Sequence, residues 1–361
     1  MEVSVVERIF THADVRRGIE IVSDSQKIGE YTKQPGVIQT FLTNPRIEDE
    51  NEPLLLLGYL NGDVCGRMFY FPTKIKIGDR IENSLGASAL LVSENAREYS
   101  VGANLMMYPI KHKYKKYLLY AGISKMAEPL YHKLLKFEWF SIPRMLQFRN
   151  GRILFQKVGL HGLLLKFLSF ISNLFVKPMV WLSIMFCRAG IRNFKVVKLE
   201  STPQWVEDIV FSDSHKYSEY HDRKWFEWVL SNNFFQHKED NQSLYGIYQN
   251  DKPLGFVLIK ERLRSDSFVW GTVVEWGSSN EKVLDEYLIN KIALTLYSKN
   301  VDIAQANSID KSTLRRIKKY GFVRHGNANI AFRDLTKELD KDYKNINNWR
   351  IRLGYSDVAF F

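Results

Sequence analysis

The sequence has only two cysteines among its 361 residues, Cys65 and Cys187. Two thiols cannot form a disulfide framework, and alone they cannot form a zinc site. We therefore expect a protein of the reducing cytoplasm that has no metal site. Residues 1–5 also lack a basic stretch followed by an apolar run, so we expect no secretory signal.

Acidic residues are absent from residues 151–199, which carry eight Lys or Arg. Residues 1–150 have 20 Lys or Arg and 17 Asp or Glu, whereas residues 200–361 have 23 of each. Most of the net charge of +11 therefore lies in the middle. Nucleic-acid binders usually spread basic residues over a folded face. Here the charge accompanies an apolar run, so we expect no nucleic-acid partner.

The length favours two domains, because one domain usually has ~100–200 residues. The first third alternates helix-like and strand-like segments around an Asn61-Gly62-Asp63 hairpin turn. This alternation predicts an α/β layer fold. The expected strands are 53–60, 64–71, 81–92 and 118–121, and the expected helices are 11–22, a helix beginning at 100–109, and 124–136.

A similar order recurs after residue 195, with a second hairpin about 190 residues after the first, which predicts a duplicated domain. We expect domains at 1–150 and 193–361, joined by an apolar, basic helical connector at 151–192. The expected elements of the second domain are strands 194–197, 243–248, 254–259, 269–276 and 301–306, and helices 284–297 and 311–320, the latter ending at Gly321 as a left-handed cap.

A phosphate-binding loop is predicted after the strand that ends at Val92. Arg97 follows five residues later, and Gly102 opens the next helix. Free N–H groups and the positive end of the helix dipole attract phosphate at such a position. Small residues at Ser100, Gly102 and Ala103 let the backbone approach a ligand closely.

The segment Arg97-x-x-Ser100-x-Gly102 resembles the Arg/Gln-x-x-Gly-x-Gly/Ala motif of the GCN5-related N-acetyltransferases (GNAT), with Ser100 in place of the first glycine. The resemblance implies that the loop amides bind the pyrophosphate of acetyl-CoA, the co-substrate. The alternative is an ordinary connection with a chance arginine and glycine. The implied cofactor-binding residues are Leu90, Leu91, Val92, Arg97, Glu98, Tyr99, Ser100, Val101, Gly102, Ala103 and Ser124.

A second motif is similar to the same family, whose members carry Asn-x-x-Ala-x-x-Leu-Tyr-x-Lys-Leu-Gly-Phe on a helix. Residues 124–137 keep five positions of this motif in register, with Ser124 in place of Asn and Leu135-Lys136-Phe137 in place of the closing Gly-Phe. The matching residues are Ala127, Leu130, Tyr131, Lys133 and Leu134. The resemblance implies that Tyr131 protonates the departing thiolate. It also implies that a splayed strand pair holds the thioester carbonyl by backbone N–H near the end of the preceding strand. The alternative is a tyrosine packed at a domain edge.

Acetyl transfer to an amine also needs a base. Glu82, on the strand before the loop, is the nearest acidic candidate, and a solvated strand-edge glutamate is the alternative. His112 and His132 lie among lysines and are weaker candidates.

The second domain departs from the family pattern. No Arg-x-x-Gly-x-Gly follows Trp276, and Glu281 would repel a pyrophosphate. Ile317 stands where the tyrosine would be. We therefore expect a domain of the same fold without cofactor chemistry, which shapes the acceptor site.

Residues 159–188 form the most apolar stretch. Lys166, Ser169, Asn173 and Lys177 fall on one helical face and apolar residues on the other. We expect Pro178 to break or kink this helix. The two lysines argue against a membrane span, and the pattern is typical of a helix lying on an anionic membrane surface. A helix pair buried between the halves is the alternative.

The sequence therefore predicts an α/β protein of two GNAT-like domains, each with a mixed, mostly antiparallel sheet flanked by helices. The predicted activity is acetyl transfer from acetyl-CoA to a primary amine, with an amino sugar or lipid-linked saccharide as the acceptor considered first. We expect a cytoplasmic protein, peripheral on the inner membrane face. The alternatives are a Fem-type aminoacyl transferase that uses aminoacyl-tRNA and a non-catalytic membrane-surface binding protein on the same fold.

Overall fold

The computed structural model describes residues 5–18, 37–123, 125–156, 159–232, 240–264, 266–352 and 354. The chain divides into two compact units, each built from several segments. The predicted boundaries, 1–150 and 193–361, are uninterrupted and therefore differ from these units. The physical reason is that backbone N–H and C=O groups pair wherever a strand edge needs a partner, regardless of sequence distance. Unit 1 comprises Met1–Ser141, Ser214–Gln236 and Asn329–Phe361, and unit 2 comprises Ile142–Asp213 and His237–Ala328.

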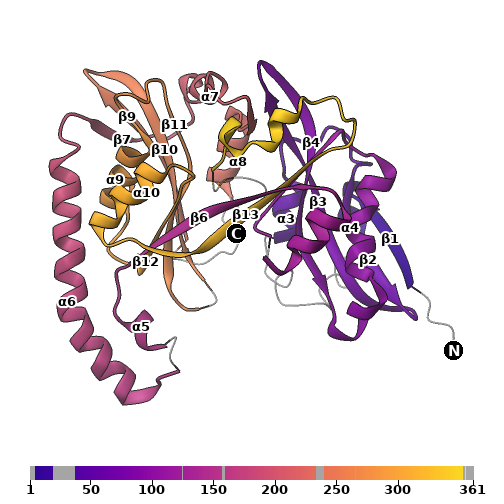
Figure 1. The fold of residues 1–361 in the computed structure, drawn as a ribbon, viewed down its shortest axis with the longest axis horizontal. Helices are drawn as coiled ribbons and strands as arrows, with labels where there is room; N and C mark the ends of the chain where they lie inside the picture. The colour runs from indigo at the N-terminus through magenta and orange to yellow at the C-terminus, as the bar shows by residue number, and fades with distance from the viewer. Residues whose placement is uncertain are drawn as a thin grey trace. The chain divides into compact units, whose positions relative to one another are not determined.

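Unit 1 contains a mixed, mostly antiparallel sheet in the order β1-β2-β3-β4-β5-β13 (Figure 1). Its strands are β1 (Val5–Thr11), β2 (Pro53–Leu60), β3 (Asp63–Ile77), β4 (Arg80–Val92), β5 (Tyr117–Ala121) and the end of β13 (Val323–Asp334). Two short strands, β8 (Tyr217–Glu219) and β14 (Trp349–Arg350), extend the sheet beside β3. The helices and helical turns are α1 (His12–Arg17), α3 (Val37–Leu42), η2 (Glu94–Tyr99), α4 (Val101–His112), η3 (Lys125–Ala127), η4 (Pro129–Leu134), α8 (Arg223–Ser231), η6 (Lys341–Lys344) and η7 (Ile346–Asn348).

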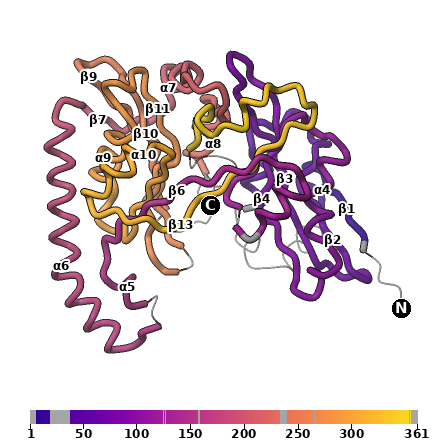
Figure 2. Tube along the Cα trace, viewed as in Figure 1, coloured from indigo at the N-terminus to yellow at the C-terminus, as the bar shows by residue number. Residues whose placement is uncertain are grey.

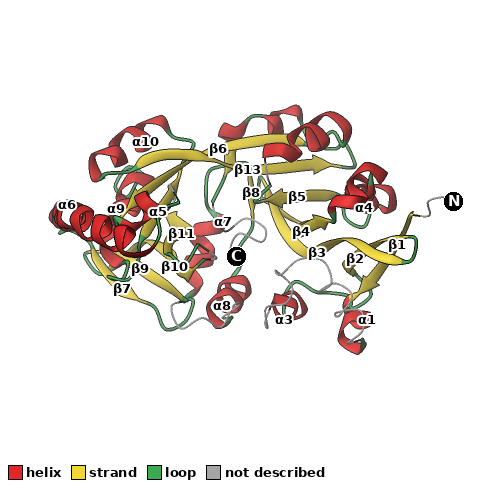
Figure 3. Cartoon of the chain, turned by 90° about the horizontal axis from the view of Figure 1, so that it is seen from below, coloured by secondary structure: helices red, strands yellow, loops and turns green. Residues whose placement is uncertain are grey.

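Unit 2 repeats the pattern in the order β6-β12-β11-β10-β9-β7. Helices cover both faces of this sheet, with α9 on the side of α6 and α7 on the other (Figure 3). The strands are β6 (Glu138–Phe148), β7 (Lys195–Lys198), β9 (Asn241–Gln249), β10 (Lys252–Leu263), β11 (Val269–Ser278) and β12 (Ile303–Asn307). The helices and the helical turn are α5 (Arg152–Gln156), α6 (Gly162–Ala189), α7 (Gln204–Phe211), α9 (Glu286–Leu296), α10 (Lys311–Ile317) and η5 (Lys318–Tyr320).

Each sheet is completed by a strand from a distant part of the chain. In unit 1, β13 pairs with β5, where Ile330 lies opposite Ala121. In unit 2, β6 pairs with β12, where Phe148 lies opposite Ile303. The yellow C-terminal segment therefore joins the purple strands of unit 1 in the chain trace (Figure 2).

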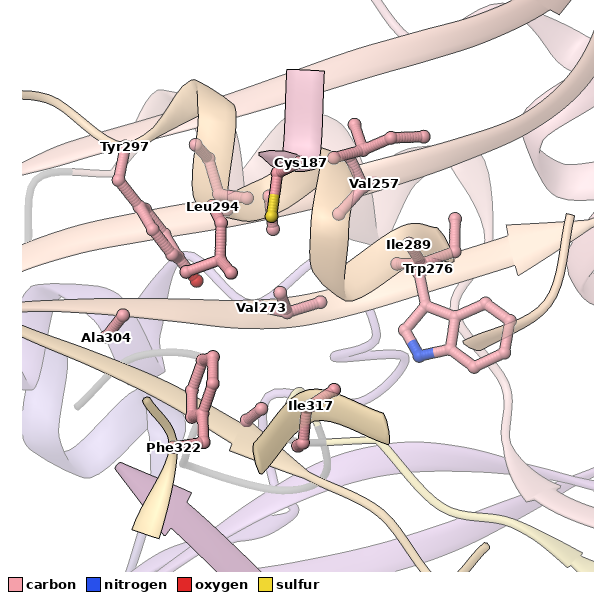
Figure 4. Packing of buried hydrophobic residues seen from close by; sticks show 14 of the residues in the cluster. Cys187, Val257, Val273, Trp276, Ile289, Leu294, Tyr297, Ala304, Ile317 and Phe322 are labelled. Carbon is pink, nitrogen blue, oxygen red and sulfur yellow. The ribbon is translucent and has the colours of Figure 1, made fainter. Parts of the chain in front are cut away.

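Each unit has its own hydrophobic core. In unit 1, side chains of α4 and the central strands surround Tyr70, Leu105 and Tyr120. In unit 2, α9 and the sheet enclose Trp276 and Tyr297 (Figure 4). The cores lie where the alternating apolar residues of the strands predict them.

The predicted hairpins, strands and Gly321 cap are confirmed, whereas two helices differ from expectation. The helix predicted at 11–22 is described as α1 up to Arg17, with Thr11 as its N-cap, and residues 19–22 lie outside the described residues. The predicted helix 124–136 is instead a short 3₁₀ turn followed by a π-helical turn, in which Leu135 N–H donates to Leu130 C=O at 2.9 Å. Pro129 begins this turn and has no N–H to give to an α-helix.

The connector forms one continuous helix, α6, so the predicted break at Pro178 is wrong. Within the described residues, α6 is long and apolar enough to cross a membrane by length and composition. Its apolar 18-residue window has a mean hydropathy of 1.6, and only 6% of this window is buried.

Candidate functional site

The candidate site begins at a β-bulge near the end of β4. Between the pairs Arg67–Leu91 and Phe69–Ser88, β4 has one residue more than β3. Ala89 lies in this bulge with a φ of 54°, in the left-handed region that non-glycine residues rarely adopt. A bulge bends the strand and redirects the residues that follow it.

The neighbouring strand β5 pairs with β4 only before this bulge. In the described part of the chain, the ladder joins Ser84 to Tyr117 and Leu85 to Leu118. The predicted ligand-binding residues 90–92 lie beyond the end of that ladder and are half-buried. A strand end of this kind can offer backbone groups to an extended ligand, as an added strand would use them.

The loop after β4 enters α4 through a left-handed residue. Ser93 fixes the end of β4, because its N–H and hydroxyl both donate to the Cys65 carbonyl, at 2.8 and 3.0 Å. Ser100 has a φ of 57°, and its N–H donates to the Arg97 carbonyl. The Ser100 side chain makes no capping hydrogen bond to α4.

The first turn of α4 therefore has N–H groups without acceptors in the helix. Asn104 N–H is the first to bond back, to the Ser100 carbonyl at 3.0 Å. The N–H groups of Val101, Gly102 and Ala103 precede it, at the positive end of the helix dipole. A helix start of this kind can bind an anion, and the phosphate site itself stays a prediction.

Two glycines bring α4 close to the sheet. Gly58 of β2 pairs with Gly66 of β3, and a Cβ on either would lie 2.8 Å from Val101 Cγ1. Val101 is fully buried between them and the unit 1 core. A Cβ on Gly102 would also lie 3.3 Å from a methyl of Val92. Because these glycines have no side chains, the start of α4 packs directly against the strands.

The side chains of the loop face solvent. Arg97, Glu98, Tyr99 and Ser100 are all exposed. A hydrogen bond to the Glu98 carboxylate, followed by its charge, raises the pKa of the Tyr99 hydroxyl. Glu98 is therefore engaged with Tyr99, and Arg97 contributes an exposed positive charge to the loop.

Tyr131 lies on the π-helical turn and is only 4% exposed. Its ring packs against those of Tyr120, Phe137 and Trp139, at centroid distances of 6.0, 5.4 and 6.1 Å. The Tyr120 hydroxyl is buried without a hydrogen-bond partner among the described residues, and burial raises its pKa well above 10. Tyr131 therefore lies in a buried aromatic cluster. Its role as the acid that protonates the departing thiolate stays a prediction.

The structure places Glu82 and His112 away from the loop. Glu82 lies near the start of β4, seven residues before the bulge residue Ala89, which is about 20 Å along a strand. Its closest ion-pair contact is Arg80 Nη1 at 3.9 Å. His112 is at the opposite end of α4 from the loop, and His132 Nδ1 lies 3.1 Å from the Phe137 carbonyl. Ser124 lies outside the described residues.

Sequence reasoning missed a buried charge cluster in unit 1. Arg46 Nη1 lies 3.7 Å from Glu219 Oε1, which is also 3.7 Å from His221 Nε2. Beside it, Lys74 Nζ lies 3.3 Å from Asp222 Oδ2. The partners come from segments far apart in the chain, so no local spacing could have indicated the cluster.

The charges in this cluster balance one another. Burial alone would raise the pKa of Asp222, but the charges of Arg46 and Lys74 and the N–H of Trp225 outweigh it, so the net pKa is below the ordinary value. Burial lowers the pKa of Arg46, partly offset by Asp222 and Glu219. A carboxylate held ionised in this way is a weak proton acceptor, so the cluster is suited to structure rather than to base catalysis.

The helix of unit 2 that corresponds to α4 is α9, and its N-terminus is capped by a side chain. The Asp285 carboxylate caps α9 by accepting from Leu288 N–H at 2.8 Å and lies 2.7 Å from Arg316 Nη1. Ile317, in the place of the family tyrosine, is buried in the core. The Asp285 carboxylate therefore already accepts from an N–H group at this helix start, and the lack of a cofactor loop in this half stays a prediction.

No family model and no curated protein matches the sequence. The fold is similar to a GCN5-related N-acetyltransferase from Anabaena variabilis, with a TM-score of 0.56 and 9% identity over 92% of this chain and 73% of the other. It is also similar to Saccharomyces cerevisiae N-myristoyltransferase with bound myristoyl-CoA (TM-score 0.57, 12% identity, 92% and 83%). A probable N-acyltransferase from Enterococcus faecalis gives a TM-score of 0.51 and 9% identity over 92% and 73%. The chain therefore has the GNAT fold, with two GNAT-like domains in tandem.

Proposed function

We propose that this protein is an acyl-CoA-dependent N-acyltransferase that binds its donor on unit 1. The uncapped, left-handed start of α4 after the bulged end of β4 carries this proposal. The fold likeness supports it, because the similar yeast structure is an N-myristoyltransferase with bound myristoyl-CoA. Unit 2 offers a capped helix at the same place, so only one donor is expected per chain.

The donor diphosphate would accept hydrogen bonds from the N–H groups at 101–103, with Arg97 adding positive charge. The pantetheine arm would lie along residues 90–92. It would form hydrogen bonds with the backbone groups on the side of β4 where the ladder with β5 has ended. One of these N–H groups would donate to the thioester oxygen, which becomes more negative in the transition state.

In the proposed reaction, the lone pair of a neutral primary amine attacks the thioester carbonyl carbon. The C–N bond forms and the C–S bond breaks. We propose that the Tyr131 hydroxyl gives its proton to the leaving thiolate, and that the proton lost by the amine passes through water to the Tyr131 phenolate and restores the hydroxyl. Acetyl-CoA and an amino sugar or lipid-linked saccharide remain our specific proposals for donor and acceptor.

Calorimetric titration with acetyl-CoA, CoA and myristoyl-CoA tests the donor site. We expect Arg97→Glu to weaken binding at least about tenfold, because it reverses a charge beside a diphosphate. Arg80→Glu is the matched control, since Arg80 is an exposed arginine at the far end of β4. It should bind as the wild type does.

Three outcomes would contradict the proposal: no binding of any of the three ligands, equal effects of the two substitutions, or full affinity in Arg97→Glu. Salt-dependent binding of aminoacyl-tRNA without binding of CoA would point instead to aminoacyl transfer.

A further inference from the structure

Helix α6 packs its polar side against unit 2 and exposes its apolar side. Ser169 and Ser183 are buried together with Leu165 and Cys187. Asn173 Oδ1 accepts a hydrogen bond from Gly151 N–H at 2.8 Å. Small and polar side chains thus make the contacts that apolar side chains usually make in a soluble protein.

The opposite side of α6 is an exposed apolar face along its whole length. Leu163 near the start is 83% exposed, Phe175 in the middle 67% and Phe186 near the end 67%. Contiguous apolar surface of this extent marks a binding face. We call the following residues the α6 face: Leu163, Leu164, Phe167, Phe170, Ile171, Leu174, Phe175, Met179, Trp181, Leu182, Met185 and Phe186.

We propose that the α6 face inserts into the surface of an anionic lipid bilayer, with the helix lying in the membrane plane. A spanning helix would have to leave unit 2, yet α6 is attached at both ends. Leu165 is buried near its start, and Cys187 lies in the unit 2 core near its end (Figure 4). Crossing a membrane in this position would draw the polar surface of unit 2 into hydrocarbon, at high cost.

The charges around the α6 face favour anionic lipid over a second copy of the chain. Lys166, Lys177 and Arg188 are exposed on α6, and residues 151–199 contain no acid. Each basic residue near an anionic surface contributes about 1 kcal/mol to binding. Two copies joined through this face would bring like charges together. Trp181, 60% exposed, is of the type that favours the headgroup level.

A groove along the α6 face can take part of one lipid tail. This pocket of about 260 Å³ is lined by Met179, Leu182 and Phe186 on α6 and by Lys319 and Tyr320 of η5. Lys319 is exposed, so it can contact a phosphate while apolar side chains hold the chain. The groove extends the apolar face toward a second basic segment, and both suit the same anionic lipid.

Flotation with lipid vesicles tests this proposal on the full chain. We expect binding to vesicles containing about one third phosphatidylglycerol, and at least about tenfold less to phosphatidylcholine alone. Phe167→Ser with Phe175→Ser should lower binding at least about tenfold by removing two inserted rings. Phe211→Ser is the control, since Phe211 is 41% exposed on α7 of the same unit.

A charge reversal and a spectroscopic reading separate the parts of the proposal. Lys319→Glu should weaken binding to anionic vesicles several-fold, whereas Lys252→Glu at the exposed β9–β10 turn should not. Brominated lipid should quench fluorescence in the wild type, and Trp181→Phe should reduce this quenching. Thermal melts of all variants check that unit 2 stays folded.

Four results would overturn the proposal. The first is a protein that stays soluble with both vesicle types, and the second is binding that the α6 substitutions leave unchanged. The third is resistance to alkaline carbonate extraction, which indicates a spanning helix. The fourth is a lipid-free dimer that the same substitutions dissociate, which would assign the α6 face to a second copy. None of these measurements depends on acyl transfer.

Discussion

At the residue scale, the candidate site depends on positions occupied by glycine, which has no side chain. A glycine in a strand usually weakens the strand, because it loses more chain entropy on folding than alanine does. Gly58 and Gly66 are nevertheless paired in the centre of unit 1, where Val101 fills the space above them. Their cost in stability is offset by the close approach of the first turn of α4, which presents the N–H groups.

Gly66→Ala tests this packing. Its Cβ would lie 2.8 Å from Val101 Cγ1 and 3.1 Å from Leu105 Cδ1. We expect the free energy of unfolding to fall by about 1–3 kcal/mol through overpacking. Affinity for acyl-CoA should fall as well, because the helix start is displaced.

Urea unfolding and calorimetry measure the two effects, and a double mutant separates their causes. Val101→Ala removes the methyl groups that the new Cβ would contact. The loss of unfolding free energy in the double mutant should therefore be smaller than the sum of the losses in the two single mutants. Strictly additive losses of unfolding free energy would show that a Cβ at residue 66 makes no unfavourable steric contact with Val101.

The sequence predicted the loop itself at this scale, because its pattern is local: a strand, an arginine and a small-residue helix start lie within about a dozen residues. It could not predict that Tyr131 is buried among aromatic rings, because this depends on which side chains come together across the sheet. The distance of Glu82 from the loop, in contrast, follows from the predicted strand 81–92, in which Glu82 is the second residue. The Arg46–Glu219 contact is a stronger example, because its partners are far apart in sequence.

At the element scale, strand and hairpin positions were predictable because turn residues and alternation are local signals. The π-helical turn at Pro129–Leu134 was not, since its residues also fit an α-helical period. The sequence predicted the two faces of α6 but left open whether its apolar face is buried or lies on a membrane surface. Amphipathicity gives two faces, and only the packing of Ser183 and Cys187 on unit 2 decides which face points inward.

Helix α8 offers a prediction about pH. Asp222 caps this helix by accepting from Trp225 N–H at 2.9 Å and also faces Lys74 and Arg46. Asp222→Asn keeps a good capping residue but removes the charge. We expect a loss of about 3 kcal/mol, because Arg46 is left buried with less compensation.

The pKa of Asp222 is lower in the folded than in the unfolded protein. Its contribution to stability is therefore complete above the unfolded pKa of about 3.9 and is lost as the pH falls through the lower folded value. Stability measured at acid pH should depend less on pH in Asp222→Asn.

Asp285→Asn is the matched control for this substitution. Asp285 also caps a helix, but it and its partner Arg316 are 38% and 41% exposed, so we expect a loss under about 1 kcal/mol. Equal losses in the two variants would contradict a special role for burial.

At the scale of the whole molecule, the repeat of two domains was readable from the sequence, whereas the exchange of their last strands was not. Strand pairing depends on which edges need partners, and β5 and β12 each take a partner from outside their own half. The order of elements along the chain is the same with or without such an exchange. Only the backbone pairing of the strands distinguishes two domains that exchange their last strands from two that do not.

This exchange predicts that the first half cannot fold alone. A fragment of residues 1–150 lacks β13, β8 and β14, so the edge of β5 and the far half of β3 lose their partners. It also lacks Glu219 and Asp222, which leaves Arg46 buried without its carboxylates. We expect this fragment to show no cooperative thermal transition and to expose apolar surface that binds a hydrophobic dye.

Co-expression with residues 151–361 provides the control, because that second fragment carries every missing strand. The two fragments should associate and regain a cooperative transition. Acyl-CoA should then stabilise the complex by an amount that grows with the logarithm of its concentration over Kd. A fragment 1–150 that unfolds cooperatively and binds acyl-CoA by itself would show that β13 and β8 are dispensable. The donor site would then be complete within an uninterrupted domain, as the sequence alone predicted.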